Sequence, residues 1–591
     1  MKNNPIQKFE INIGVVMKIT LVALNASYTH TSLACAYLIS FCQDPRWSIA
    51  SLEFTINDHY DAILSRLYAA ESDVYGFSCY IWNIDLALRL SEDLKLIRPD
   101  SYIVLGGPEV SYDAEDIMIK QPQINAIVCG EGEETMYELL QTLVNGQAPS
   151  EIPGLVIRYN DELIVGPPRT PIKNLDVIPS PVSYMHNTQG RLVYYETSRG
   201  CPFSCSYCLS AQETGVRFFS LERVKRELEV LIKSGAKVIK FVDRSFNCHE
   251  QRARQIMEFI LEHDTPTQFH FEINAELLSD EMLDFLAGVP KGLFNFEIGI
   301  QSTYSPTLKA IRRKTDWPHL RNRIQCLQAM GNIHLHVDLI AGLPHESYYQ
   351  FAHSFNEVFY LQPDVIQLGF LKMLKGSPLR DQAAHYQYIF QNYAPYEVLS
   401  NNVISFAELD RLHMIEEMLV RFYNSRHFKA TIEHLTQKTY QGDAFQCFAD
   451  LAKSWRENNY HLRQHSKEAE YRFLLKFAEH CCPKEHLLIQ ELLKLDYLSS
   501  FPTGRLPYAL ESFNPEDYSN RLYRFLKDDQ FMTLHFPQLA HVSPRQRRRR
   551  IHLEWLKLDI AQGNYLPSAV PTFFLYDSSR KELEYIYQPD L

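Results

Sequence analysis

The strongest constraint on the fold of this chain is a regular alternation of short β-rich runs with amphipathic helical patterns. Between residues 17 and 146 the alternation predicts five strands with helices between them. Repetition at this spacing predicts a parallel sheet covered on both faces, a doubly wound domain. The expected strands are Ile19–Leu24, Ile49–Phe54, Val74–Ser78, Tyr102–Leu105 and Ala126–Cys129, and the expected helices cover 32–41, 60–69, 85–96 and 113–119.

The alternation stops at a proline-rich stretch and then resumes. Seven prolines fall between residues 149 and 181, which predicts an ordered linker with a hairpin near 155–164. From Leu192 six more strands are expected, enough for a partial barrel with its site at the carboxyl ends of the strands. These strands are Leu192–Thr197, Val238–Val242, Phe269–Ile273, Phe294–Ile300, His334–Leu339 and Val365–Leu371.

Beyond about residue 380 the pattern becomes mainly helical, with one hairpin expected near 572–587. The predicted fold class is therefore α/β, with a doubly wound domain, a partial (β/α)6 barrel and a mainly helical C-terminal domain. The corresponding ranges are 1–16 for an N-terminal extension, 17–148 for the first domain, 149–190 for the linker, 191–380 for the barrel and 381–591 for the C-terminal domain.

Composition narrows the class of protein. The 591 residues are 46% hydrophobic and 22% charged, as in a soluble globular protein, and the net charge of −12 does not favour nucleic acid as a partner. No run of 18 apolar residues is present, so no helical membrane span is expected. Glu10 and Lys18 interrupt the apolar N-terminal run, so this run is not expected to be a signal peptide and we expect a cytoplasmic protein. Met17 could be the true start.

Three of the 12 cysteines stand apart from the rest, which are scattered as reduced core thiols would be. Cys201, Cys205 and Cys208 follow the first barrel strand with the spacing C-x3-C-x2-C. Three thiolates on one loop can hold three irons of a cubane cluster and leave the fourth iron open. The alternative is a zinc site, which needs four ligands and would have to recruit Cys248.

With Tyr207 as the aromatic residue of C-x3-C-x-aromatic-C, this segment resembles the signature of the radical S-adenosylmethionine (SAM) superfamily. The resemblance implies a 4Fe–4S cluster that binds SAM at its open iron and cleaves it to a 5′-deoxyadenosyl radical. Asp243 is expected to accept hydrogen bonds from the amino group of SAM, or otherwise to cap a helix. Glu272 and Arg313 are expected to face SAM or to be ordinary ion-pair partners. The SAM-binding residues implied are Tyr207, Asp243, Glu272, Glu297, Gln301, Ser302, Arg313 and Gly342.

The first domain then resembles the cobalamin-binding domain that precedes a radical SAM barrel in one class of this superfamily. Its glycine-rich loops follow strands, where doubly wound sheets bind ligands, and a dinucleotide is disfavoured because G-x-G-x-x-G is missing. The cobalamin-binding residues implied are Asn25, Ser78, Tyr80, Gly106, Gly107, Glu109, Gly130 and Gly132.

One departure from a cobalamin pattern concerns the first loop. It has no Asp-x-His-x-x-Gly, so no imidazole ligand to cobalt is expected, and His30 is interpreted as a surface or hydrogen-bonding histidine. Tyr80, Trp82 and Tyr112 are expected either to pack on the corrin or to belong to the core.

Together these features predict a cobalamin-dependent radical SAM enzyme that methylates an unactivated carbon, reduced by a low-potential flavodoxin or ferredoxin. The substrate and any catalytic residues besides the cofactor ligands are not identified. A radical cyclase or rearrangement enzyme and a non-catalytic cobalamin sensor stay open. A methylthiotransferase would need three more cluster cysteines in the first domain, and the candidates are Cys35, Cys42, Cys79 and Cys129.

Five arginines lie between Arg545 and Arg550, ahead of an amphipathic stretch at 551–560. A solvated run that leads a helix is the expectation, and binding of an anionic substrate, a tRNA or an acidic electron donor is the alternative.

Overall fold

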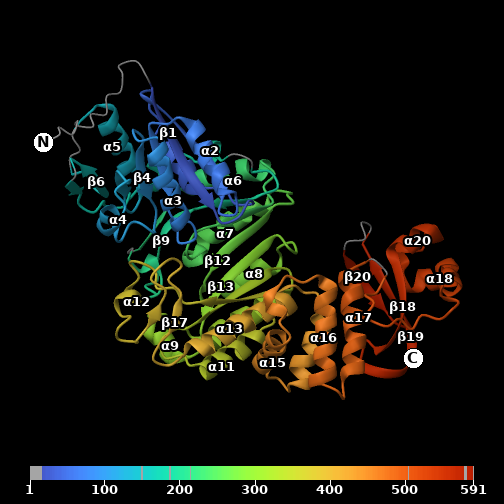
Figure 1. Cartoon of the computed structure of the whole chain (residues 1–591). Helices are drawn as coiled ribbons and strands as arrows, with labels where there is room; N and C mark the ends of the chain where they lie inside the picture. Colours follow the sequence, from blue (N-terminus) through green and yellow to red (C-terminus); the bar gives the residue numbers. More distant parts are fainter. Residues whose placement is uncertain are drawn as a thin grey trace. The chain divides into compact units, whose positions relative to one another are not determined.

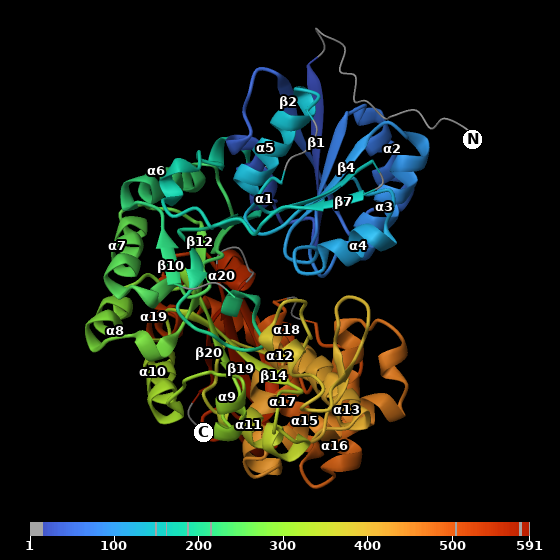
Figure 2. The same ribbon diagram turned by 90° about the vertical axis from the view of Figure 1, so that its left-hand side faces the viewer.

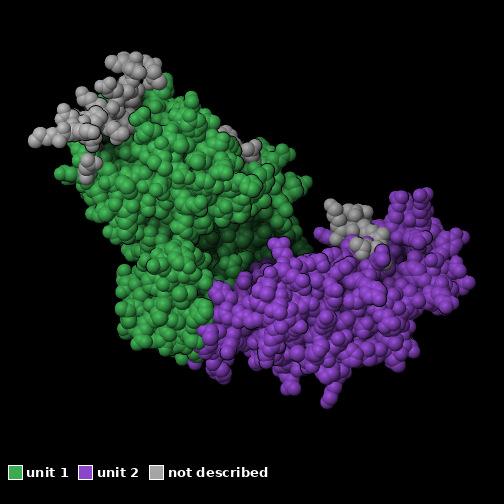
Figure 3. All heavy atoms as spheres, in the orientation of Figure 1, with its two compact units in different colours: residues 1–347, 361–363, 367–406 green, residues 348–360, 364–366, 407–591 purple. Residues whose placement is uncertain are grey.

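A computed structural model describes residues 16–147, 151–160, 162–185, 188–212, 215–502, 505–577 and 582–589. The chain divides into two compact units, shown in different colours in Figure 3. Unit 1 comprises residues 1–347, 361–363 and 367–406, and unit 2 comprises 348–360, 364–366 and 407–591. The predicted N-terminal extension lies outside the described residues except for Val16, as do Pro149 and residues 578–580 of the predicted hairpin turn.

Unit 1 begins with the predicted doubly wound sheet (Figure 1). Its five parallel strands have the order β2-β1-β3-β4-β5, and the chain reverses its winding direction between β1 and β3. The predicted hairpin forms as well, and it extends this sheet by two antiparallel strands, β6 and β7. The strands are β1 (Met17–Asn25), β2 (Trp47–Thr55), β3 (Val74–Ser78), β4 (Tyr102–Gly106), β5 (Ala126–Val128), β6 (Leu155–Tyr159) and β7 (Glu162–Val165).

Helices cover both faces of this sheet (Figure 2). Ile19 and Leu21 of β1 pack toward α1 and α5, whereas Val22 and Leu24 pack toward α2, α3 and α4. This alternation follows from the two-residue period of a strand and buries an apolar layer on each side. The helices are α1 (Leu33–Phe41), α2 (Tyr60–Ala70), α3 (Ile84–Ile97), α4 (Ala114–Lys120) and α5 (Gly132–Val144), of which α5 was not predicted.

The second sheet is the predicted partial barrel. Its six strands have the sequential order β15-β14-β13-β12-β11-β8, so each βα unit places its strand beside the preceding one. Their carboxyl ends meet at one mouth. The strands are β8 (Leu192–Tyr195), β11 (Val238–Phe241), β12 (Gln268–Ile273), β13 (Phe294–Gln301), β14 (His334–Ala341) and β15 (Val365–Phe370). The intervening helices of unit 1 are α6 (Leu221–Lys233), α7 (Glu250–Leu261), α8 (Asp280–Ala287), α9 (Ser305–Ala310) and α10 (Trp317–Met330).

Unit 2 is mainly helical and ends in a three-stranded antiparallel sheet. The predicted hairpin forms between β19 and β20, and the amphipathic stretch before it is a third strand, β18. The elements are α11 (Tyr348–Phe359), α13 (Phe406–Met418), α14 (Lys429–His434), α15 (Ala444–Glu457), α16 (Lys467–Cys481), α17 (His486–Ser500), α18 (Tyr518–Lys527), α19 (Asp529–His535), α20 (Pro544–Arg550), β18 (Ile551–Asp559), β19 (Asn564–Tyr576) and β20 (Leu583–Tyr587). Among the described residues, no helix is both long enough and apolar enough to cross a membrane.

The arginine run departs in part from its expected solvated character. It forms the short helix α20, and the side chain of Arg547 is buried within unit 2. Its guanidinium donates hydrogen bonds to the carbonyl oxygens of Leu526 and Leu539 at 2.7 and 3.0 Å and pairs with Asp529 at 2.8 Å. Arg547 therefore ties α18, α19 and α20 together, whereas Arg545, Arg548 and Arg549 are exposed.

Candidate functional site

A cavity of about 340 Å³ lies at the mouth of the barrel. Strand ends and the loops that follow them supply its wall, which places groups distant in sequence around one space. All three cysteines of the predicted triad line it. The full lining is Cys201, Pro202, Phe203, Ser204, Cys205, Tyr207, Cys208, Ser210, Arg244, Ser245, Glu272, Ile273, Asn274, Glu297, Gly299, Gln301, Arg312, Arg313, Lys314 and Asp338.

Asp243, which is 2% exposed, binds the segment that precedes the cysteine loop. Its carboxylate accepts hydrogen bonds from the amide and hydroxyl of Thr197 at 2.9 and 2.7 Å and from the hydroxyl of Ser198 at 2.5 Å. Burial raises the pKa of Asp243, although these three donors oppose the shift. Asp243 lies outside the cavity lining and anchors the segment that leads to Cys201.

The three thiols line one cavity, and the charges of two of them act on the third. Burial, together with the charges of Cys208 and Cys205, raises the pKa of Cys201, so the three sulfurs influence one another. Among the described residues, no three or more His, Cys, Asp or Glu side chains are arranged to hold a single metal ion, as a zinc site would require. Cubane ligation places each thiolate on a different iron and makes no such demand.

Acidic side chains line the wall opposite this loop. Glu297 of β13 accepts hydrogen bonds from Lys240 Nζ and His270 Nε2, both at 2.7 Å. Burial raises the pKa of Glu297, but the bond from His270 and the charge of Lys240 outweigh it and lower the pKa to about 2. Burial raises the pKa of Glu272 and Asp338, and the negative charge of Glu297 contributes.

Gln301 and Arg313 bring polar groups to the same wall. Gln301 has a φ of +72°, and its buried Oε1 has no hydrogen-bond partner among the described residues. Nη1 of Arg313 lies 3.9 Å from Cys205 Sγ, and its Nη2 donates to the carbonyl oxygen of Gly299. An orphaned buried acceptor is costly unless a ligand supplies a donor, so the wall fits a polar ligand such as SAM.

Two further predicted SAM residues lie elsewhere. Ser302 is fully buried and donates a hydrogen bond to Glu346 Oε1 at 2.6 Å. The carbonyl oxygen of Gly342 accepts hydrogen bonds from Tyr388 Oη at 2.9 Å and Asn401 Nδ2 at 3.1 Å. Neither residue lines the cavity, and each is hydrogen-bonded to a residue distant in the chain.

Sequence reasoning missed several lining residues. Arg244, Arg312 and Lys314 add positive charge beside Arg313, and Asp338 adds a carboxylate. Arg244 directly follows Asp243 at the end of β11, and Asp338 shares the inward side of β14 with His336. Position at a strand end was therefore the signal that could have found Arg244, since such ends gather at the mouth.

At the carboxyl edge of the first sheet, Asn25 and Ser78 end the adjacent strands β1 and β3. Asn83 fastens these strand ends, because its Nδ2 donates to the carbonyl oxygens of Leu24 and Ser78 at 3.0 and 2.9 Å. Tyr80 stacks on Trp82 with ring centroids 4.4 Å apart, and Trp82 is 46% exposed. This aromatic pair at the switch point, with Trp82 as its exposed member, fits a large planar ligand.

Backbone packing differs between the glycine-rich loops of the first domain. Gly107 has a φ of +115°, and a Cβ there would lie 2.5 Å from the carbonyl oxygen of Cys79, so this glycine is needed for backbone packing. The carbonyl oxygen of Gly106 accepts a hydrogen bond from the amide of Cys79 at 2.7 Å. Glu109 is buried and pairs with Lys375 at 3.1 Å. Gly130 has open space around it.

Gly132 begins α5, where an added Cβ would lie 3.5 Å from the side chains of Leu38 and Val128. In the first loop, His30 Nδ1 lies 3.3 Å from Tyr194 Oη, as expected for a hydrogen-bonding histidine. Burial lowers the pKa of His30, and the charge of Lys240 lowers it further. Tyr112 packs its ring against Gly376 beyond the barrel strands.

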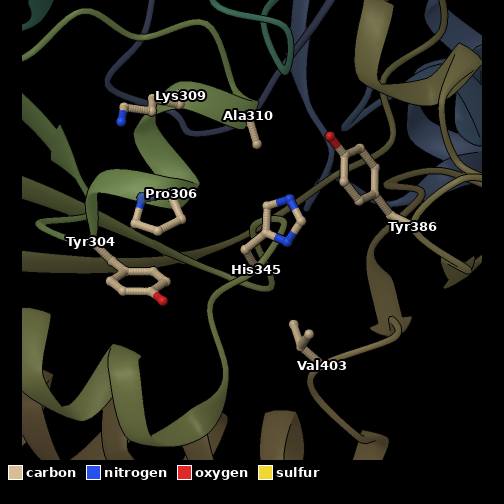
Figure 4. Close-up of a pocket in the computed structure, with 7 residues that line it drawn as sticks. All are labelled: Tyr304, Pro306, Lys309, Ala310, His345, Tyr386 and Val403. Atoms are coloured by element: carbon tan, nitrogen blue, oxygen red, sulfur yellow. The ribbon is translucent and has the colours of Figure 1, made fainter.

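A second, open cavity of about 530 Å³ lies at the rim of unit 1 (Figure 4). It is lined by Tyr304, Pro306, Lys309, Ala310, His345, Tyr386 and Val403. His345, which lies at the centre of this group in Figure 4, has a φ of +64° and packs edge-on against Tyr386 with ring centroids 5.5 Å apart.

The candidate cluster cysteines of the first domain lie in two different hydrophobic cores. Cys35, Cys42 and Cys79 are buried, and burial raises the pKa of each to about 12. Cys35 and Cys42 belong to the hydrophobic core on one face of the sheet, whereas Cys79 and Cys129 belong to the core on the other face. This arrangement argues against the ligand set that a methylthiotransferase would need.

Three family models match successive parts of the chain. The B12 binding domain matches residues 19–140, the radical SAM superfamily matches 195–358, and a family described as a protein of unknown function (DUF4080) matches 384–570.

Known proteins resemble parts of the chain. TokK, a cobalamin-dependent radical SAM methyltransferase of Streptomyces tokunonensis, is 30% identical over 49% of this chain and 44% of its own. The anaerobic magnesium-protoporphyrin IX monomethyl ester cyclase of Rubrivivax gelatinosus is 24% identical over 49% of this chain and 54% of its own. This chain therefore spans about half the length of these relatives.

A solved structure shares the fold. The radical SAM methyltransferase TsrM of Kitasatospora setae, with cobalamin and a 4Fe–4S cluster bound, has a TM-score of 0.53 at 17% identity. The superposition covers 63% of this chain and 75% of TsrM.

Proposed function

Starting from a chain that joins a B12-binding domain to a radical SAM domain, we propose a cobalamin-dependent radical SAM enzyme that methylates an unactivated carbon. The observation that carries the proposal is the cavity at the barrel mouth. Three cysteines of one loop line it together with both acidic and basic side chains. The relatives include a methyltransferase of this kind, which supports the same reaction class.

The residues divide naturally among the cofactors. Cys201, Cys205 and Cys208 would hold the cluster, the wall containing Glu297 and Gln301 would bind SAM, and the carboxyl edge of the first sheet would bind cobalamin. When bound, the cluster with SAM supplies hydrogen abstraction by a radical, and cobalamin supplies the methyl group.

The side chains themselves recognise a zwitterion. Glu297 stays ionised at neutral pH because Lys240 and His270 stabilise its charge, so it offers a fixed negative group to an amino substituent. Arg244, Arg312 and Lys314 offer positive charge to a carboxylate on the same ligand. The methionine moiety of SAM carries both groups.

The proposed function requires a reducing compartment and a protein that donates electrons to the cluster. All twelve cysteines are free thiols in the structure, which fits a cytoplasmic location. A low-potential flavodoxin or ferredoxin would reduce the cluster.

Anaerobic reconstitution tests the proposal. We expect about four irons and one cobalamin per chain, a SAM-dependent change in the electron paramagnetic resonance (EPR) spectrum of the reduced protein, and formation of 5′-deoxyadenosine. Cys205→Ser should lose these properties. The matched control Cys248→Ser should keep them, because Cys248 is outside the cavity lining. A fully ligated metal centre indifferent to SAM would refute the proposal.

A radical cyclase is the second candidate, favoured by the cyclase relative. Methyl-deuterated SAM separates the two, because a methylase transfers the label to its product whereas a cyclase does not. A metabolite that accumulates in a deletion strain would provide the substrate for this measurement.

A further inference from the structure

The acidic loop Gly130-Glu131-Gly132-Glu133 of the B12-binding domain meets the cysteine loop of the barrel through one residue, Arg199. Its guanidinium lies 2.6 Å from Glu133 and 3.5 Å from Glu131. Arg199 precedes Cys201 by two residues on the short strand β9 (Ser198–Cys201). One side chain thus joins the segment that bears the cluster ligands to a loop at the carboxyl edge of the first sheet.

Because Arg199 and its partners are largely buried, breaking this contact costs free energy. The Arg199 side chain is 13% exposed and that of Glu133 is 6% exposed. Arg199 also pairs with Glu196 at 2.9 Å and lies over the ring of Tyr37, with its guanidinium carbon 5.2 Å from the ring centroid. Removing one partner of a buried ion pair leaves the other charge without compensation, which is strongly unfavourable.

A neighbouring pair holds the acidic loop in place. Arg217 donates to both carboxylate oxygens of Glu131, at 2.7 and 3.1 Å. Arg217 lies on β10 (Gly215–Phe218), which pairs with β9 so that Arg217 is opposite Arg199. The two arginines therefore project from one antiparallel ribbon onto one loop.

A second contact between the same two domains lies at the other glycine-rich loop. Lys375, beyond the last barrel strand, pairs with Glu109 at 3.1 Å and Asp113 at 2.9 Å. The hydroxyl of Tyr396 also donates to Glu109. In both glycine-rich loops of the first domain, acidic side chains therefore form ion pairs with residues of the barrel.

We propose that Arg199 is a positioning residue that couples the cysteine loop to the B12-binding domain, with Glu131 and Glu133 as its partners. The inference rests on the proposed function only for the cofactors assigned to the two loops, the cluster and cobalamin. The coupling itself follows from the buried contacts. A change at either end should be felt at the other, because linkage between two sites is reciprocal.

Hydrogen–deuterium exchange of the full-length protein tests this coupling. Arg199→Gln should raise exchange about tenfold or more both at 130–135 and at 199–208. Glu133→Gln, a nearly isosteric change in the first domain, should raise exchange at 199–208 in the barrel. Arg199→Lys keeps the charge but lacks the planar fork, so its effect should be intermediate.

The matched control is Arg254→Gln, because Arg254 forms an exposed ion pair with Glu258 within α7. This variant should leave exchange at both loops unchanged. If Glu133→Gln alters exchange only within 126–144, the coupling is refuted even if the enzyme proves active. Should Arg199→Gln fail to fold, the Glu133→Gln result decides.

A spectroscopic readout separates coupling from simple stability. In the wild-type protein, adding cobalamin should alter the EPR spectrum of the reduced cluster, and Glu133→Gln should diminish that response while iron content stays the same. An undiminished response in Glu133→Gln would overturn the proposal. Absence of cobalamin binding in the wild type would instead refute the proposed function and leave the exchange test valid.

Discussion

At the scale of single residues, the site depends on carboxylates whose surroundings give them different tasks. Glu297 is kept ionised beside two donors and faces the cavity, whereas Asp243 is enclosed by three donors of its own chain. Glu297 lies within β13 and Asp243 follows β11, so both belong to the same barrel. Which carboxylate is offered to a ligand is therefore decided by the hydrogen bonds around it.

Asp243→Asn should loosen the cysteine loop. An amide cannot accept all the hydrogen bonds that the carboxylate accepts, so we expect unfolding free energy to fall by about 1–3 kcal/mol and iron content after reconstitution to fall with it. Urea unfolding and iron analysis measure the two effects. Asp280→Asn, at a side chain 83% exposed, is the control. Unchanged iron content in Asp243→Asn would contradict the assigned role.

Glu297 predicts a pH dependence of stability. Its pKa in the folded protein is lowered to about 2, so its stabilising contribution is present above the ordinary glutamate pKa and is lost as pH falls from about 5 toward 2. Relative to Glu297→Gln, the cofactor-free wild type should lose about 3 kcal/mol of unfolding free energy across that range. Urea unfolding at successive pH values measures this difference. Parallel pH profiles for the two proteins would refute it.

At the scale of elements, a turn needs glycine for one of two different reasons. Gly107 combines a positive φ with a close approach to the Cys79 backbone, whereas Gly130 has a positive φ and free space. The two loops look alike in sequence. Their tolerance of a side chain should therefore differ.

Gly107→Ala should cost about 2 kcal/mol or more of unfolding free energy, because the new Cβ would collide with backbone that cannot easily move. Gly130→Ala is the matched control and should cost about 1 kcal/mol, the penalty of the left-handed conformation alone. Thermal or urea unfolding compares the variants. Equal costs would show that the packing at Cys79 is not limiting.

At the scale of the whole molecule, each of the two compact units has its own hydrophobic cores. The cavity with the cysteine triad and the carboxyl edge of the first sheet both belong to unit 1. Unit 2 has a separate core between its terminal sheet and α18 and α19. Cofactor binding is thus expected to act on one unit.

Differential scanning calorimetry with hydroxocobalamin tests this expectation. A ligand at 100 times its dissociation constant should stabilise the unit that binds it by about 2.7 kcal/mol. We expect the transition of unit 1 to move to higher temperature while that of unit 2 stays in place, with hydrogen exchange at 551–558 identifying the latter. Equal stabilisation of both units would contradict it.

The local sequence was sufficient for most elements and for the cysteine triad. Strands and helices of unit 1 follow short-range periodicity, and Cys201, Cys205 and Cys208 lie on one loop, so neither needed knowledge of distant contacts. The strand β18 was harder to assign, because an amphipathic stretch fits a helix or a strand until a partner strand is known.

The roles of individual acids were decided by the tertiary structure. Glu109, Glu131, Glu133 and Asp243 all follow strands, as ligand-binding residues do. The three glutamates pair with cations distant in the chain, and Asp243 accepts hydrogen bonds from Thr197 and Ser198. A buried carboxylate must find donors, and its sequence neighbours do not reveal which ones the fold will bring to it. Sequence thus determined the strand-helix frame and the placement of the three cysteines on one loop, whereas folding determined the partners of each carboxylate, because charge compensation acts through space.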